Sequence, residues 1–202
     1  MKTLPWRRET ELFTQGENGY HTYRIPAINV APDGTILVFC EGRKNNHWDF
    51  YEIHIVLRRS MDGGATWEPM QVIASDGDNT IGNPCVVVDK DTATVWLVYC
   101  KNNTQVYTIH SKDNGITWSQ PYDCLVNSPH GPVRLADGRL LYAGKELWRE
   151  NPRIGVAQSV DDGDSWKWLA TISPREGHPS HKSHDSHAVE AALRTLIVQI
   201  RN

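Results

Sequence analysis

Two arginines and an aspartate near the N-terminus are residues whose types and spacing could do chemistry. Arg24 stands in the run Tyr-Arg-Ile-Pro, and Arg43 and Asp49 flank a polar loop further on. A guanidinium group binds a carboxylate through two charge-assisted hydrogen bonds and stays charged at any working pH. A carboxyl group can transfer a proton when partial burial keeps it protonated near the working pH. Simpler interpretations stay open, since strand-end arginines often form surface salt bridges and loop aspartates often stabilise turns.

The loop around Asp49 also carries aromatic residues. Trp48 and Phe50 stand on either side of it. We expect these two side chains to supply apolar walls that bury the carboxyl group in part.

Four histidines form a second candidate cluster, at a spacing of three residues: His178, His181, His184 and His187. On a helix this spacing would place metal ligands along one stripe. Pro179 and the absence of apolar periodicity argue against a helix. A polar loop explains the histidines as well, so we predict no metal site and no cofactor.

The fold that must position these residues is indicated by an eight-residue phrase, Ser-x-Asp-x-Gly-x-Thr/Ser-Trp. It occurs three times, at 60–67, 111–118 and 159–166, with Asp-to-Asp spacings of 51 and 48 residues. Asp followed two residues later by Gly is typical of a turn, because the carboxylate accepts hydrogen bonds from backbone N–H groups and Gly adopts positive φ. The closing Trp has an apolar face to bury and an N–H that needs a partner. We therefore predict a structural turn, and no chemistry, for all three copies.

Strand-like runs fill the intervals between the phrases. The expected strands lie at 23–30, 35–40, 52–58, 70–74, 83–88, 94–100, 105–110, 130–135, 140–143, 153–158, 168–172, 187–191 and 195–200, with a short extended candidate from Glu11 to Thr14. A period near fifty residues with four antiparallel strands per repeat is typical of a β-propeller. The sequence predicts an all-β fold, almost no helix, and about three and a half four-stranded blades in a single domain spanning 1–202.

The phrase resembles the Asp-box of sialidases and other Asp-box propellers, and Tyr-Arg-Ile-Pro resembles the sialidase arginine motif. The resemblance implies a six-bladed propeller that removes terminal sialic acid with retention. It implies that Arg24 and Arg201 bind the substrate carboxylate, that Arg43 contacts substrate, and that Asp49 is the general acid/base.

The same resemblance gives roles to residues near the C-terminus. Arg201 matches the second carboxylate-binding arginine, and Asp185 stands where the family has a glutamate that activates the nucleophile. Glu190 matches a further acidic position, with a structural role as the alternative, and His130-Gly-Pro matches a segment that lines the central cleft. The resemblance places the third arginine and the nucleophilic tyrosine beyond Asn202.

Composition narrows the partners. The 202 residues carry a formal net charge of −3 and a pI near 6.3, which does not favour binding to nucleic acid or anionic membranes. No apolar run is long enough to span a membrane, and no apolar stretch follows the charged N-terminus, so we expect no signal peptide and a cytoplasmic protein. Four widely spaced cysteines predict buried free thiols rather than disulfides or a metal site: Cys40, Cys85, Cys100 and Cys124.

Three functions stay open on these grounds. The first is an exo-α-sialidase that acts on sialylated glycans. The second is a non-catalytic Asp-box module that binds a glycan or a protein, and the third is a glycosidase or lyase acting on another acidic sugar. Because a propeller leaves no sheet edge unpaired, self-association could complete or cover the open edge.

Overall fold

A computed structural model describes residues 9–146, 150, 152–173, 184–191 and 195–201, without the side chains of His184, Asp185 and Arg201. Every regular element in these ranges is a β-strand. The strands are β1 (Thr22–Val30), β2 (Ile36–Arg43), β3 (Ile53–Ser60), β4 (Gln71–Ala74), β5 (Ile81–Asp89), β6 (Thr94–Lys101), β7 (Gln105–Ser111), β8 (Tyr122–Cys124), β9 (Val133–Arg134), β10 (Leu140–Lys145), β11 (Ile154–Ser159), β12 (Lys167–Thr171), β13 (His184–Glu190) and β14 (Leu196–Arg201). Across the described part of the chain there is no helix that could cross a bilayer.

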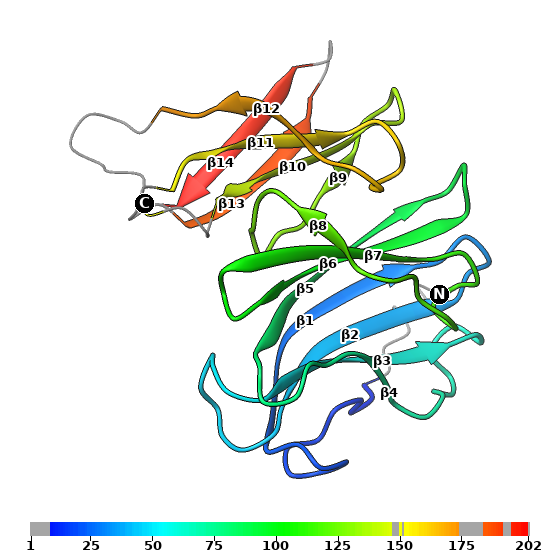
Figure 1. Ribbon diagram of the computed structural model, residues 1–202. Helices are drawn as coiled ribbons and strands as arrows, with labels where there is room; N and C mark the ends of the chain where they lie inside the picture. Colours follow the sequence, from blue (N-terminus) through cyan, green and yellow to red (C-terminus); the bar gives the residue numbers. More distant parts are fainter. Residues whose placement is uncertain (1–8, 147–149, 151, 174–183, 192–194, 202) are drawn as a thin grey trace, which may run out of the picture.

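The strands form four antiparallel sheets in chain order. Three sheets have four strands each, β1–β4, β5–β8 and β9–β12, and the fourth is the pair β13–β14. The first three sheets follow one another from the bottom to the top of Figure 1, and β13 lies beside β10. This arrangement is a partial β-propeller with three complete blades and half of a fourth, as the sequence predicts.

The middle strands show why the blades stack. The run Thr94–Lys101 is almost continuously apolar, and its side chains alternate between two faces. Val95, Leu97 and Tyr99 pack against the first blade, whereas Trp96 and Val98 pack against the third. A strand buried on both faces needs apolar residues at every position, which explains the missing polar alternation.

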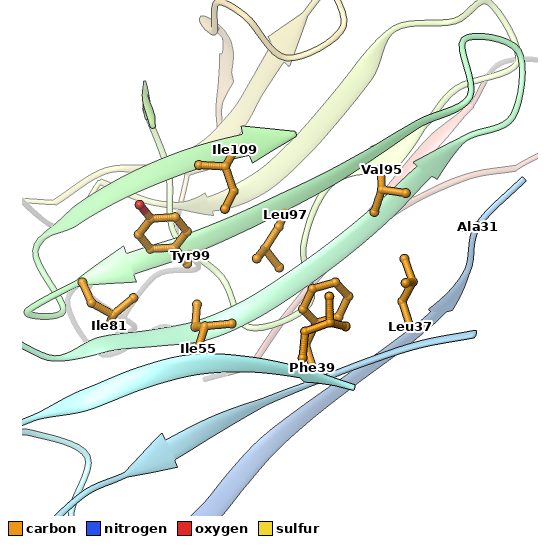
Figure 2. Packing of buried hydrophobic residues seen from close by; sticks show 10 residues of the cluster. Ala31, Leu37, Phe39, Ile55, Ile81, Val95, Leu97, Tyr99 and Ile109 are labelled. Atoms are coloured by element: carbon orange, nitrogen blue, oxygen red, sulfur yellow. The ribbon is translucent and has the colours of Figure 1, made fainter. Parts of the chain in front are cut away.

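An apolar cluster fills the space between the first two blades. Figure 2 shows Leu37, Phe39 and Ile55 of the first blade facing Leu97 and Ile109 of the second. Leu37, Phe39, Ile55 and Leu97 have no solvent exposure. Burial of this apolar surface holds the two sheets face to face.

The three Asp-box phrases form the predicted turns. In the first, the Asp62 carboxylate accepts the backbone N–H and the hydroxyl of Thr66 at 2.8 and 2.7 Å, and the Ser60 hydroxyl at 2.9 Å. The N–H of Gly64 donates to the Ser60 hydroxyl at 2.8 Å, and Gly64 has a φ of +86°. The same donors and acceptors recur in the copies centred on Asp113 and Asp161.

One expectation about these turns is wrong. The indole N–H groups of Trp67, Trp118 and Trp166 have no hydrogen-bond partner among the described residues. The rings contribute by apolar burial, since Trp118 packs against the cluster between blades one and two and Trp166 belongs to the cluster between blades two and three.

Two other expectations meet different outcomes. The extended candidate Glu11–Thr14 is wrong, because no strand forms there. Phe13 instead packs on the Tyr23 ring at a centroid distance of 5.2 Å and covers one face of the first blade. The cysteine prediction is confirmed, since Cys40, Cys85, Cys100 and Cys124 are all buried and free. Burial raises the pKa of Cys40 to about 12 and that of Cys100 to about 11, so these thiols are poor nucleophiles.

Candidate active site

Strand β1 carries Arg24 at a bulge. The register with β2 pairs Arg24 with Glu41 and Ala27 with Phe39, and it shifts between them. Ile25 takes up the extra residue with a φ of +53°, a conformation that strains a β-branched side chain. Pro26, which lacks an N–H, lies on this edge strand as the sequence predicts.

The same bulge recurs at the start of other blades. In β5 the register shifts between Gly82 and Cys85, and Asn83 before Pro84 has a φ of +54°. In β13 the shift lies between His184 and His187, which places the backbone of Asp185 at the bulge. Residues in sparsely populated conformations often mark functional sites. Two of the predicted site residues, Arg24 and Asp185, therefore stand at or beside a bulge of the first strand of a blade.

Arg43 is the centre of the charged cluster. Its side chain is only 2% exposed at the end of β2. The guanidinium donates to the Glu41 carboxylate from Nε and Nη2, at 3.1 and 2.7 Å, and Nη2 also lies 2.6 Å from Asp49 Oδ1. Nη1 donates to the carbonyl oxygen of His47 at 2.5 Å. Arg43 thus connects a buried carboxylate, an exposed carboxylate and the loop backbone between them.

Glu41 is a site residue that we did not predict. It is 4% exposed, and its Oε1 accepts the N–H of Asn83 at 2.8 Å, which links the first blade to the bulge of the second. Gly82 has no Cβ where the carboxylate lies, since a Cβ there would be 2.7 Å from Oε1. Burial raises the pKa of Glu41, and the Asn83 N–H and Arg43 oppose that rise. The sequence feature that could have predicted Glu41 is its spacing from Arg43, since two opposite charges stand two residues apart at the end of an apolar strand.

Asp49 is brought next to both predicted arginines, but not into a buried setting. Its Oδ1 lies 3.9 Å from Arg24 Nη1 and 2.6 Å from Arg43 Nη2. The Asp49 side chain is 75% exposed and that of Arg24 is 50% exposed. The expectation of apolar walls is wrong, since Trp48 and Phe50 are themselves 53% and 47% exposed. Both aromatic rings lie on the surface of the loop rather than over the carboxylate.

Three predicted residues lie in the half blade. The backbone of Arg201 ends β14 and pairs with His184, one residue before Asp185. The side chains of Asp185 and Arg201 lie outside the described residues. Glu190 has a structural contact, because its Oε2 accepts the N–H of Ala136 at 2.8 Å and joins the fourth blade to the third.

The histidine candidates are described only in part. His178 and His181 lie outside the described residues, as does the His184 side chain. The exposed rings of His130 and His187 meet edge to face at 5.5 Å. The described residues contain no group of three His, Cys, Asp or Glu side chains that could hold a metal ion.

The cluster places a positively charged and a negatively charged side chain, Arg24 and Asp49, next to each other at the surface. Arg24 presents a half-exposed guanidinium that can pair with an anionic group, and Asp49 presents a carboxyl that can exchange a proton. Arg43 is occupied by Glu41, Asp49 and the His47 carbonyl, so it holds Asp49 in place.

Comparison with known proteins assigns the family. The BNR repeat-like domain matches residues 51–201, most of the chain. The chain is a member of the sialidase/BNR-repeat family. An exo-alpha-sialidase of Aspergillus fumigatus is 32% identical over 154 residues, which are 73% of this chain and 32% of that protein. A sialidase of Micromonospora viridifaciens is 31% identical over 194 residues, 92% of this chain and 25% of the other.

Solved structures show the same fold. The Hadza microbial sialidase Hz136 matches with a TM-score of 0.76 and 24% identity, over 93% of this chain and 43% of the other. Trypanosoma rangeli sialidase in complex with the inhibitor DANA matches with a TM-score of 0.67 and 19% identity, over 90% and 35%. Among the curated relatives, this member of the sialidase/BNR-repeat family spans about a third of the length of the first ones that it matches.

Proposed function

We propose that this chain contributes blades of the propeller of an exo-α-sialidase, a glycoside hydrolase that removes terminal sialic acid from glycans. The observation that carries the proposal is the Arg24–Arg43–Asp49 cluster at the end of the first blade, in a family whose relatives include sialidases. The half-exposed Arg24 binds the sugar carboxylate, and Arg201 adds a second guanidinium. Asp49 protonates the glycosidic oxygen as the bond breaks and later takes a proton from the attacking water.

The remaining roles follow from the same proposal. Arg43 positions Asp49, and Glu41 fixes Arg43 from the buried side. Retention requires a nucleophile, which the resemblance gives as a tyrosine with Asp185 as its acidic partner. The exposed Asp49 seen here must lose water contact when sugar binds, because a carboxyl group donates a proton more readily in a dry site.

The test is hydrolysis of a fluorogenic sialoside by the complete propeller, in which this chain is combined with the blades that supply the nucleophile, together with binding of free sialic acid. We expect Asp49→Asn to lower kcat/KM by roughly 10²- to 10³-fold with little change in sialic acid affinity. Arg24→Ala should weaken sialic acid binding by roughly 10- to 100-fold, because a charge-assisted pair is lost. Asp123→Asn, an exposed carboxylate on β8, is the matched control and should change neither value.

Two results would redirect the proposal. No turnover with retained sialic acid affinity would favour a binding module that recognises the acidic sugar without cleaving it. Unchanged binding in Arg24→Ala would remove the carboxylate site from both interpretations. Cytoplasmic location and self-association stay predictions.

A further inference from the structure

The loop that carries Asp49 exposes a row of aromatic rings. Trp48, Phe50 and Tyr51 are 53%, 47% and 58% exposed. Trp48 stacks on His47 with centroids 4.8 Å apart and on Phe50 at 5.9 Å, and Phe50 meets Tyr51 at 4.6 Å. These four rings, the aromatic row, form a continuous surface within five consecutive residues. An exposed apolar patch of this kind marks a binding site more often than isolated surface residues do.

The backbone beneath the row is held from several directions. Arg43 donates to the carbonyl oxygen of His47, Asn103 donates to that of Asp49 at 3.3 Å, and Thr80 donates to that of Tyr51 at 2.8 Å. Tyr51 has a φ of +79°, a strained value for a residue with a side chain. Contacts from the first blade and from the second blade therefore fix the loop in a conformation that keeps its rings in solvent, at a cost in backbone energy.

We propose that the aromatic row binds the neutral sugar to which the terminal acidic sugar is linked. This inference rests on the proposed function, because Asp49 protonates the oxygen that joins the two sugars. Asp49 lies between Trp48 and Phe50 in the chain, so the leaving sugar must come within a few ångströms of the row. A pyranose has one face of C–H groups that packs on aromatic rings, while its hydroxyl groups stay in water.

Charge separates the two sugar subsites. Arg24 Nη1 lies 3.9 Å from Asp49 Oδ1, and its half-exposed guanidinium suits an anionic sugar. Trp48 and Phe50 have apolar rings, which suit a neutral sugar. The row thus selects for glycans in which the acidic sugar is attached to an uncharged pyranose, rather than for the free acid.

The test compares three ligands: 3′-sialyllactose, free sialic acid and lactose. Each is titrated into the whole chain and into three variants, Trp48→Ala, Trp48→Phe and Tyr122→Ala. Tyr122 is a matched control, because it is a surface aromatic residue, 37% exposed, that stacks on His110 in the second blade. Thermal melting of each variant checks that the fold is unchanged.

We expect Trp48→Ala to weaken sialyllactose binding by about fivefold and to leave sialic acid affinity within about twofold. Trp48→Phe should restore most of the affinity, and Tyr122→Ala should change nothing. Two results would overturn the proposed role of the aromatic row and leave the proposed function standing. The first is equal affinity of the unaltered chain for sialyllactose and sialic acid. The second is an equal loss of affinity for both ligands in Trp48→Ala. Trp48-dependent binding of lactose without binding of sialic acid would support the row and overturn the sialidase proposal. Binding of none of the three would overturn both.

Discussion

At the scale of single residues, the site depends on a buried carboxylate, that of Glu41. Glu41 and Arg43 are 4% and 2% exposed and paired by two hydrogen bonds, so each removes the cost of burying the other's charge. Arg43 can then reach Asp49 with the same Nη2 that contacts Glu41. The position of the exposed Asp49 is therefore set by a buried ion pair.

Substitution of Glu41 tests this dependence. Glu41→Gln keeps the shape but leaves Arg43 without its buried counter-charge, and we expect it to lower the free energy of unfolding by about 3 kcal/mol in chemical denaturation. Glu68→Gln is the matched control, since Glu68 binds Arg59 through the same two nitrogens at 2.8 and 2.6 Å but is 33% exposed. Its loss should be about 1 kcal/mol or less. Equal losses in the two variants would show that burial of Glu41 adds nothing.

At the scale of elements, the Asp-box is a turn whose stability depends on charge. The backbone N–H of Thr66, and then the hydroxyls of Thr66 and Ser60, lower the pKa of Asp62 to about 2 from an ordinary value of 3.8. A lowered pKa means that the folded chain favours the ionised carboxylate. Its contribution to stability is present above about pH 4 and is lost as the pH falls toward 2.

Melting of Asp62→Asn at a series of pH values tests whether the lowered pKa of Asp62 stabilises the fold. Near neutral pH the variant should melt a few degrees below the unaltered chain, because an amide cannot accept the same set of hydrogen bonds. The difference in Tm should shrink between pH 4 and pH 2, where the native carboxylate becomes protonated. Asp123→Asn should show no such convergence. A gap that stays constant down to pH 2 would mean that the turn is held by shape and not by charge.

At the scale of the whole molecule, the second and third Asp-box turns also space their blade from the one before it. A Cβ on Gly115 would lie 3.2 Å from Leu37 and 3.3 Å from Leu57 in the first blade, and a Cβ on Gly163 would lie 2.9 Å from the Trp96 ring in the second. Gly64, at the same position in the first blade, would meet only Trp67 and Ile36 of its own blade, at 3.6 Å or more. The repeated glycine thus serves the turn in every blade and the blade contact in two of them.

Alanine at two of these glycines separates the two roles. Gly64 and Gly163 share a φ of +86°, so the backbone strain of Gly64→Ala and Gly163→Ala is the same, about 1 kcal/mol. Gly163→Ala must also displace the buried Trp96 ring, and we expect a total loss of about 3 kcal/mol in free energy of unfolding. Denaturant titration of both variants measures the difference. Losses within about 0.5 kcal/mol of each other would contradict the spacing role.

The sequence by itself determined the repeating part of this protein. The Asp-box phrase and its period predict the turns and the blades, because they are local patterns that each blade satisfies in the same way. They also predict the proximity of Arg24, Arg43 and Asp49, since these residues flank adjacent strands of one blade.

Only the tertiary structure decided what surrounds those residues. Glu41 finds its partner in Asn83 of the next blade, and no pattern within one blade announces a contact between two. Trp48 and Phe50 are apolar by type, yet blade contacts at Thr80 and Asn103 fix their loop so that both rings face solvent. Burial depends on which distant segments pack together, and this is why the Asp49 carboxyl is exposed where residue type alone predicted a partly buried one.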